Sequence, residues 1–493
     1  MTGFCYEPKR VLDLSAFADV SEGFLEGRIS LLKGDCLALL DRLPENYFDA
    51  AITDPPYHYQ TIVDRFGGEN AAACQAGTDG AFKRASAGFM GKKWDGGDVA
   101  FRSETWAKVL RVLKPGAHLA AFSAPKCAHK MGMAIEAAGF EVRDRIINLF
   151  NPDPALKAFL DSLTVAQADA LFKIMDHFGG LGEAFWCFGS GFPKSHNISK
   201  AIDKMLGAER PVIGTRKEAD KRGGNLMRAA AGEGGQTFDY AITQAATPQA
   251  AAFDGWGTAL KPAYEPIFIA RKPIAVGNSI AAQVLETGTG AINIDGARIG
   301  ERFPANLAHD GSAAAVGGFP EQQSGAILAH HKSSESENVA MAGKNYARSR
   351  SKNFEASSGS ASRFFYSGKA NGDDRLGSGH PTVKPVDLMQ WLCRMLCPVG
   401  GLILDPFSGT GTTGEAAFRE NMSAVLIERE TDYQADIARR MGLVMAGPQT
   451  RLHQSEKAKA VRRAEMEISG DKDAPKAPDD LLAMMQHENE AAQ

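Results

Sequence analysis

The residues best suited to do chemistry begin with Asp54-Pro55-Pro56-Tyr57, which follow the apolar run Phe48–Thr53. A carboxylate followed by a backbone carbonyl can accept both N–H groups of an exocyclic amine on a nucleobase, which is otherwise a poor nucleophile. Proline has a fixed φ and no N–H, so the loop keeps its carbonyls aimed into a site. Tyr57 offers a ring on which an extruded base can stack. Taken alone, these four residues would equally suit a strand that ends in a proline turn.

A second candidate is the glycine-rich loop Asp405–Gly414, between the apolar runs Leu402–Leu404 and Ala424–Ile427. Its glycines fit the pattern G-x-G-x-x-G, which lets a cofactor approach the backbone at a helix N-terminus. Glu428 ends the second run and could hold ribose hydroxyls. A dinucleotide-dependent oxidoreductase would share this pattern. That alternative is disfavoured, because too few residues follow the loop for a two-halved dinucleotide fold and because it leaves Asp54–Tyr57 without a role.

A third motif, His380–Pro385, lies between the other two and precedes the helix-like run Val386–Leu392. Pro385 suits the first helical turn. We expect Thr382 and Lys384 to point a hydroxyl and an ammonium toward the glycine loop, where they could meet a carboxylate on the cofactor. Taken alone, the motif is an ordinary loop before a helix.

These three motifs, in this order, resemble the S-adenosylmethionine-dependent DNA amino-methyltransferases of the β type, in which the catalytic motif precedes the cofactor motif. The resemblance covers roughly residues 25–300 and 360–447 and is strongest to bacterial and phage-type members. Three ordered motifs make it specific, where any one would be weak. Other matching stretches are Gly34-Asp35, Phe89–Asp95, Leu113–Gly116, Gly189–Asn197, Lys261–Pro266 and Arg363–Tyr366.

The resemblance implies site-specific methylation of an exocyclic amine, with S-adenosyl-L-methionine as cofactor and double-stranded DNA as substrate. Aspartate in the first position of the tetrad favours adenine N6, since relatives with serine there more often methylate cytosine N4, and cytosine stays open. A non-catalytic DNA-binding protein with the same fold is a further alternative, which the intact motif residues disfavour. The recognition sequence, a homodimer and a partner nuclease of a restriction-modification system are left open.

The resemblance also assigns the site residues. Asp35 would contact the cofactor adenine and Glu428 its ribose, while Thr382 and Lys384 would lie near its methionine end. The catalytic and base-binding residues are Asp54, Pro55, Pro56 and Tyr57. The cofactor-binding residues are Asp35, Thr382, Lys384, Asp405, Phe407, Gly409, Gly411 and Glu428.

Strand-like and helix-like runs alternate along the chain. Phe48–Thr53 and His118–Phe122 read as strands, and Glu104–Leu113 and Lys126–Ala138 read as helices. This alternation predicts an α/β fold with a mostly parallel sheet, with ligands at the carboxyl ends of the strands. We therefore expect a Rossmann-like methyltransferase sheet. It would be circularly permuted, with the catalytic half before the cofactor half and an inserted target-recognition region.

Changes in composition divide the chain further. Amphipathic runs mark an insertion, and a late stretch with few large apolar residues reads as a tail. The predicted parts are an N-terminal segment (1–24), the catalytic half (25–150), a helical insertion (151–185), a continuation of the catalytic region (186–300), a candidate target-recognition region (301–370), the cofactor-binding half (371–447) and a charged, disordered tail (448–493).

Basic residues interleaved with aromatic ones in the candidate target-recognition region fit phosphate contacts and base stacking. A flexible, solvated loop would have a similar composition. The Gly- and Arg-bearing loop Gly214–Gly235 is a second candidate for DNA contact. The DNA-binding candidates of the first region are Lys344, Arg348, Arg350, Lys352 and Arg363.

Composition agrees with one large catalytic domain with insertions, or two domains: the chain has 493 residues, of which 44% are hydrophobic. No run approaches about 20 unbroken apolar residues, so no membrane span is expected. Met1–Glu7 lacks the features of a signal peptide, and seven cysteines in so long a chain indicate reduced thiols, so we expect a cytoplasmic protein. Cys393 and Cys397 read as core thiols, since no matching Cys/His pair completes a metal site. A net charge of −4 does not exclude DNA binding, which local basic patches decide.

Overall fold

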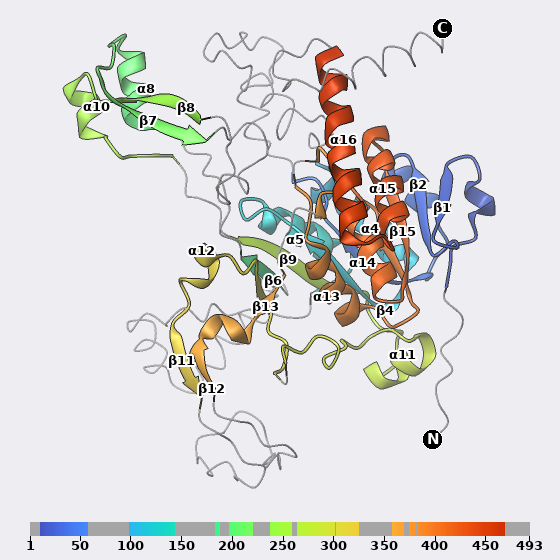
Figure 1. Ribbon diagram of the computed structural model, residues 1–493. Helices are drawn as coiled ribbons and strands as arrows, with labels where there is room; N and C mark the ends of the chain where they lie inside the picture. Colours follow the sequence, from blue (N-terminus) through green and yellow to red (C-terminus); the bar gives the residue numbers. More distant parts are fainter. Residues whose placement is uncertain are drawn as a thin grey trace, which may run out of the picture. The chain divides into compact units, whose positions relative to one another are not determined.

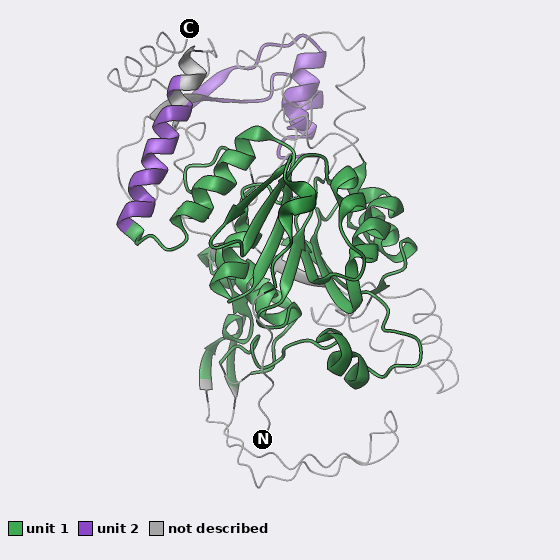
Figure 2. Cartoon of the chain, turned by 90° about the vertical axis from the view of Figure 1, so that its right-hand side faces the viewer, with its two compact units in different colours: residues 1–189, 264–448 green, residues 190–263, 449–493 purple. Residues whose placement is uncertain are grey.

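The computed structural model describes residues 10–57, 98–142, 183–187, 197–219, 237–258, 264–300, 302–324, 357–368, 374–380 and 382–468. The chain divides into two units, residues 1–189 with 264–448 and residues 190–263 with 449–493 (Figure 2). Most of the predicted helical insertion, and the DNA-binding candidates Lys344, Arg348, Arg350 and Lys352, lie outside the described residues.

A large sheet organises the first unit, and both ends of the chain supply strands to it. The strands are β1 Ser21–Phe24, β2 Ile29–Lys33, β3 Phe48–Thr53, β4 Leu113–Phe122, β5 Glu141–Val142, β6 Glu183–Cys187, β9 Tyr264–Arg271, β10 Leu307–His309, β13 Tyr366–Ser367, β14 Leu402–Asp405 and β15 Ser423–Glu428. Their order is β1-β2-β15-β14-β3-β4-β9-β6-β10-β13, with β5 paired to β9.

The centre of the sheet is parallel. Strands β2, β15, β14, β3 and β4 run in one direction, and β9 is antiparallel to both β4 and β6. Strands β14 and β15, from the C-terminal part, lie between the N-terminal strands β2 and β3. Figure 1 shows β15 beside β2. The expected α/β class and Rossmann-like sheet are confirmed, and the circular permutation stays a prediction.

The central strands of this sheet are apolar and alternate their side chains between its two faces, so both faces need a cover. Helices cover both faces, and the central strands are buried along almost their whole length. The described helices of this unit are η1 Leu14–Phe17, α1 Cys36–Arg42, η4 Val99–Phe101, α4 Ser103–Val112, α5 Ala128–Ala137, α11 Ile280–Thr287, α12 Ala313–Val316, η6 Ala361–Phe364, α13 Val386–Leu396, α14 Thr412–Arg419 and α15 Thr431–Leu443.

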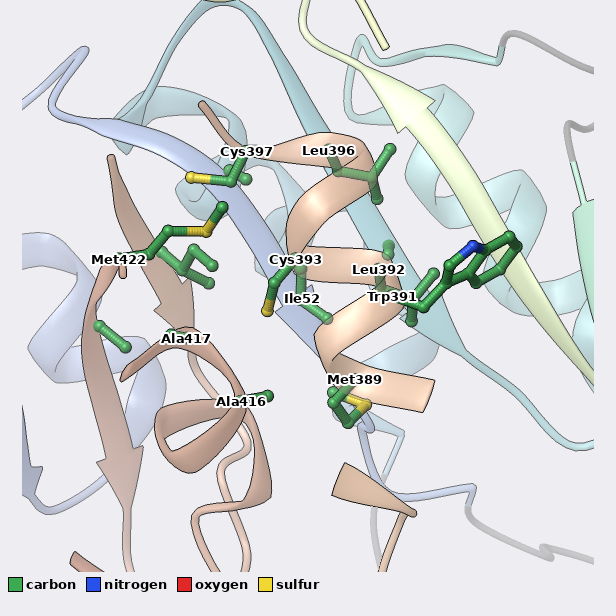
Figure 3. Packing of buried hydrophobic residues seen from close by; sticks show 14 of the residues in the cluster. Ile52, Met389, Trp391, Leu392, Cys393, Leu396, Cys397, Ala416, Ala417 and Met422 are labelled. Atoms are coloured by element: carbon green, nitrogen blue, oxygen red, sulfur yellow. The ribbon is translucent and has the colours of Figure 1, made fainter. Parts of the chain in front are cut away.

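Alternation along the second half of β3 shows how two cores arise. Ala50 and Ile52 join a core with α13, α14 and α15, whereas Ala51 joins a core with α1, α4 and α5. In the first core, Trp391 of α13 donates its indole N–H to the carbonyl of Ala297 at 3.0 Å. Figure 3 shows the apolar side of α13 packed beside α14 and Ile52. Cys393 and Cys397 lie inside this core, as expected.

The second unit contains α8 Ile198–Met205, the hairpin β7 Val212–Ala219 with β8 Thr237–Thr243, and α10 Pro248–Ala252. Asp203 is its polar centre: its carboxylate pairs with Arg210 at 2.5 Å and accepts N–H groups from Ala246 and Thr247. The DNA-contact candidate Gly214–Gly235 begins on β7, and residues 220–236 lie outside the described residues. In the part of the chain that the structure describes, no helix is long and apolar enough to cross a bilayer.

The expectation of a disordered tail is wrong for its first half. Residues Pro448–Ile468 form the 21-residue helix α16, in which Arg451, Ser455 and Ala464 are buried. The sequence is rich in Ala, Glu, Lys and Arg, which are strong helix formers, so charge content alone was a poor guide to disorder here. Residues 469–493 lie outside the described residues.

Candidate active site

The sheet brings three of the predicted acids to one edge. Asp54 follows β3, Asp405 ends β14 and Glu428 ends β15, and these three strands are parallel neighbours. The carboxyl ends of parallel strands meet at the same edge, which is where α/β sheets bind ligands. Residues more than 350 positions apart in the chain therefore share one site.

Four polar side chains meet at this edge, and we call Asp54, Tyr57, Glu265 and Lys384 the charge cluster. The Lys384 Nζ lies 2.8 Å from Asp54 Oδ2 and 2.9 Å from Glu265 Oε2. It also donates to the Tyr57 hydroxyl at 3.2 Å, and that hydroxyl donates to Asp54 Oδ1 at 2.7 Å. Expected as a stacking surface, Tyr57 thus also holds Asp54 through its hydroxyl.

The cluster is shielded from water, with side-chain exposures of 6% for Lys384, 19% for Asp54 and 15% for Glu265. Burial alone would lower the pKa of Lys384, but the charges of Asp54 and Glu265 hold it above its ordinary value. Burial raises the pKa of Glu265, and the charge of Lys384 opposes that rise. The ammonium also lies 4.9 Å from the centroid of the Phe122 ring, which favours a cation.

Asp405 connects the charge cluster to the glycine loop. Its buried carboxylate accepts the Thr53 hydroxyl at 2.6 Å, the Thr413 hydroxyl at 2.5 Å and the Phe407 N–H at 3.1 Å. Burial raises the pKa of Asp405 to about 6, against the effect of these hydrogen bonds. Asp405 was expected to line the cofactor pocket. Its carboxylate is bonded to Thr53, Thr413 and Phe407, which fixes the start of the loop, and its place in a cofactor pocket stays a prediction.

The glycine loop has the backbone that its sequence requires. Gly409 and Gly411 have φ values of +51° and +76°, which side chains rarely adopt. A Cβ on Gly414 would lie 2.8 Å from Leu426, so this glycine lets α14 pack closely on β15. Phe407 is half-buried and packs against the core of α1, α4 and α5. The loop leads into the N-terminus of α14, whose first backbone N–H groups have no partner within the helix.

Glu428 and Asp35 lie near each other, because the N–H of Gly34 donates to the Glu428 carbonyl at 3.0 Å. Glu428 accepts the Glu430 N–H at 2.8 Å, and burial raises its pKa to about 7. Asp35 caps α1 by accepting the N–H groups of Leu37 and Ala38. The two acids can hold a hydroxyl-bearing ligand beside the glycine loop.

The motif His380–Pro385 lies beside the glycine loop through His380 and contributes Lys384 to the charge cluster. His380 accepts the N–H of the half-buried Thr382 at 3.2 Å, and burial lowers the pKa of its imidazole to about 4, so the ring is neutral at pH 7. A Cβ on Gly409 would lie 3.5 Å from His380 Nε2. Pro385 is the residue before α13 rather than in its first turn. The Lys384 ammonium pairs with two carboxylates of the chain, and its expected place near the methionine end of a cofactor stays a prediction.

A buried ion pair between α14 and α15 lies against the glycine loop and stabilises it. Arg440 of α15 binds Glu415 of α14 at 2.7 Å, and its Nε donates to the Thr410 carbonyl at 2.7 Å. Both partners are at most 1% exposed. The guanidinium also donates to the Asp374 carbonyl. The loop is therefore fixed at two points, by Arg440 at Thr410 and by Asp405 at Phe407.

We predict that Arg440→Leu lowers the free energy of unfolding by about 3–5 kcal/mol, because it removes the buried cation from Glu415 Oε2. The 38% exposed Arg419 stays paired with Glu415 Oε1 and compensates the buried charge less well. The double variant with Glu415→Leu should lose less than Arg440→Leu alone. Arg429→Leu is the matched control, since Arg429 forms an exposed ion pair with Glu430 that is worth at most about 1 kcal/mol. Urea unfolding of the four proteins measures this, and equal losses for Arg440→Leu and Arg429→Leu would contradict the prediction.

The Arg363 side chain forms hydrogen bonds within the local fold. Its guanidinium donates to the carbonyls of Ser360 at 2.8 Å and Gln322 at 2.9 Å, and it lies 4.3 Å from the Phe364 ring centroid. It ties η6 to the hairpin of β11 Glu321–Ser324 and β12 Ser357–Ser360. These bonds give Arg363 a structural role, and its contact with DNA stays a prediction.

Glu265 is the site residue that sequence analysis missed. Tyr264-Glu265-Pro266 belonged to the resemblance but was given no role. The available signal was an acid at the start of the apolar strand β9, which pairs with β4, the neighbour of β3. Phe122 was likewise read only as a strand residue, although its ring lies beside Lys384.

Comparison with known protein families gives one match. Residues 215–439 match the sequence model of the N6_N4_Mtase family, described as DNA methylase. This range includes Glu265, Lys384 and the glycine loop, and it does not reach Asp54 or Asp35.

Several solved structures are also similar. TTHA0409 of Thermus thermophilus, described as a candidate DNA modification methylase and solved with S-adenosyl-L-methionine, is 14% identical, with coverage of 85% of this chain and 94% of that one and a TM-score of 0.35. The PvuII DNA methyltransferase (cytosine-N4-specific) is 13% identical, with coverage of 93% and 96% and a TM-score of 0.34. The M1.HpyAVI–SAM complex is 11% identical, with coverage of 83% and 98% and a TM-score of 0.30. Scores of this size establish neither fold nor activity.

Proposed function

We propose, from the match of residues 215–439 to the DNA methylase family model, that this chain transfers a methyl group from S-adenosyl-L-methionine to adenine N6 of an extruded base in double-stranded DNA. The observation that carries the proposal is the meeting of Asp54 and Tyr57 with the glycine loop at one sheet edge, joined through Thr53 and Asp405.

The residues present fit such a cofactor. Gly409 and Gly411 leave the backbone open at positive φ, and Glu428 and Asp35 offer carboxylates beside the loop. When bound, S-adenosyl-L-methionine supplies the electrophilic methyl group. We assign the ribose hydroxyls to Glu428, the adenine to Asp35 and the methionine end to the region of Thr382.

The chain's own residues act on the amine. Asp54 and the Pro55 carbonyl would each accept one of its N–H groups, which favours a reactive lone pair on nitrogen. The ring of Tyr57 would stack on the flipped base, while Pro55 and Pro56 keep the loop rigid. Asp54 does not deprotonate the amine before attack, because an aryl amine is far too weak an acid. Positioning and the exclusion of water supply much of the rate.

Adenine is proposed over cytosine because aspartate, not serine, stands at position 54. Cytosine N4 methylation by the same residues is the second candidate. Incubation of duplex DNA with the protein and a donor labelled in its methyl group tests the activity itself. Label in the DNA is expected, and its absence in a folded, cofactor-binding protein would contradict the proposal.

We further propose that the basic residues near 350 contact DNA phosphates. Replacing Arg348, Arg350 and Lys352 by glutamine should weaken DNA binding and reduce the salt dependence of the binding constant by about one unit of slope per lost contact. Fluorescence anisotropy at several salt concentrations measures this. A variant that instead lacks the exposed side chains of Arg102, Lys130 and Arg298 loses the same charge elsewhere. Equal effects of the two variants would show that no specific contact exists.

A further inference from the structure

Glu265 is a buried acid that the proposed mechanism does not use. It lies near the start of β9, and its Oε2 lies 2.9 Å from the Lys384 Nζ. On the other side, the same ammonium lies 2.8 Å from Asp54 Oδ2. Lys384 is thus shared between two carboxylates that come from different strands.

With both carboxylates ionised, the charges of Asp54, Glu265 and Lys384 sum to one negative charge. Asp54 and Glu265 are two carboxylates, and Lys384 is the cation that the structure pairs with them within its described residues. His380, the nearby imidazole, is neutral because burial lowers its pKa to about 4. Burying a charge that no opposite charge compensates costs free energy of folding. The excess carboxylate of this cluster is therefore expected to serve a function.

The proposed methyl transfer creates a positive charge that the excess carboxylate can stabilise. The amine nitrogen uses its lone pair to form a bond to the methyl carbon, the carbon–sulfur bond breaks, and its electron pair stays on sulfur. The nitrogen then carries an extra bond and a positive charge until it releases a proton to solvent. Positive charge therefore develops on the base amine beside Asp54, and a fixed negative charge there stabilises it most where water is excluded.

We propose that Glu265 is a positioning residue for methyl transfer: by sharing Lys384 with Asp54, it leaves one net negative charge beside the reacting amine. This inference rests on the proposed function. If Lys384 faced Asp54 alone, the pair would be neutral, and Asp54 would be a weaker acceptor for the amine N–H groups.

Charge variants of the full-length protein test the inference. Glu265→Gln should lower the single-turnover rate about ten-fold or more, because the cluster becomes neutral. The double variant Glu265→Gln/Lys384→Met restores one net negative charge on Asp54, so it should be faster than Glu265→Gln alone. The affinity for S-adenosyl-L-methionine, measured by calorimetry, should stay within about three-fold in each. Glu136→Gln, on the exposed side of α5, is the control and should match wild type.

A second readout needs neither cofactor nor DNA. Thermal unfolding of the wild type, the two single variants and the double variant gives the coupling between Glu265 and Lys384. Lys384→Met should be the least stable, since it leaves two carboxylates together without their cation, and adding Glu265→Gln should recover part of the loss. Additive effects would show that the two side chains do not share charge.

The outcomes separate the inference from the function on which it rests. A wild type without methyl transfer refutes the proposed function, while the unfolding cycle still reports charge sharing. An active wild type, a slow Glu265→Gln and a faster double variant support the inference. A double variant slower than Glu265→Gln, or a Glu265→Gln rate within about two-fold of wild type, would overturn it.

Discussion

Asp54→Ala is expected to lower the rate of methyl transfer about a thousand-fold or more, because the base amine loses the carboxylate that orients it. The affinity for S-adenosyl-L-methionine should change only a few-fold, since the glycine loop is held by Asp405 and Arg440 and not by Asp54. Lys384 stays paired with Glu265 in this variant, so the site should remain folded. Single-turnover kinetics and calorimetry together measure the two effects.

Two further variants make this result specific. Asp54→Asn keeps the shape of the side chain but removes its charge, and it should also be severely slowed. Asp432→Ala removes an exposed carboxylate from the first turn of α15 and should leave the rate unchanged. If Asp54→Ala keeps a rate near that of the wild type, the catalytic assignment is wrong.

Gly409→Val is expected to weaken the binding of S-adenosyl-L-methionine about a hundred-fold, because its φ of +51° is unfavourable for a branched side chain. The new atoms would also enter the space between the loop and His380. Calorimetric titration measures the affinity, and circular dichroism establishes that the variant is folded.

The matched control for this glycine is Gly442→Ala. Gly442 lies near the end of α15, and nothing lies within 4 Å of a Cβ built on it. Alanine there should leave the affinity unchanged and raise stability by about 0.5–1 kcal/mol, because glycine is a poor helix former. A folded Gly409→Val with wild-type affinity would remove the loop from the cofactor site.

The parts of the fold that could be predicted from the sequence are mostly those that local residue patterns determine. Phe48–Thr53 was expected as a strand and is β3 with the same limits. The run Ala424–Ile427 lies within β15, and the glycine-rich run lies where expected, between β14 and α14. These features depend on neighbours in the sequence, so sequence spacing alone predicts them.

The missed features depend on contacts between distant segments. Glu265 meets Lys384 only because β9 lies beside β4 in the sheet, and no local pattern announces that pairing. The hydroxyl partners of Asp405, Thr53 and Thr413, are likewise recognisable only in three dimensions. The tail was judged by charge content, although its helix-forming residues extend α16 to Ile468.

Mass spectrometry of nucleosides tests the central claim most directly. Unmethylated duplex DNA is incubated with the full-length protein and a donor whose methyl group carries deuterium, and the DNA is then digested to nucleosides. We expect labelled N6-methyldeoxyadenosine from the wild type and none from Asp54→Ala. Labelled N4-methyldeoxycytidine would keep the mechanism and correct the base, whereas no labelled nucleoside from a folded wild-type protein that binds the donor and duplex DNA would contradict the account.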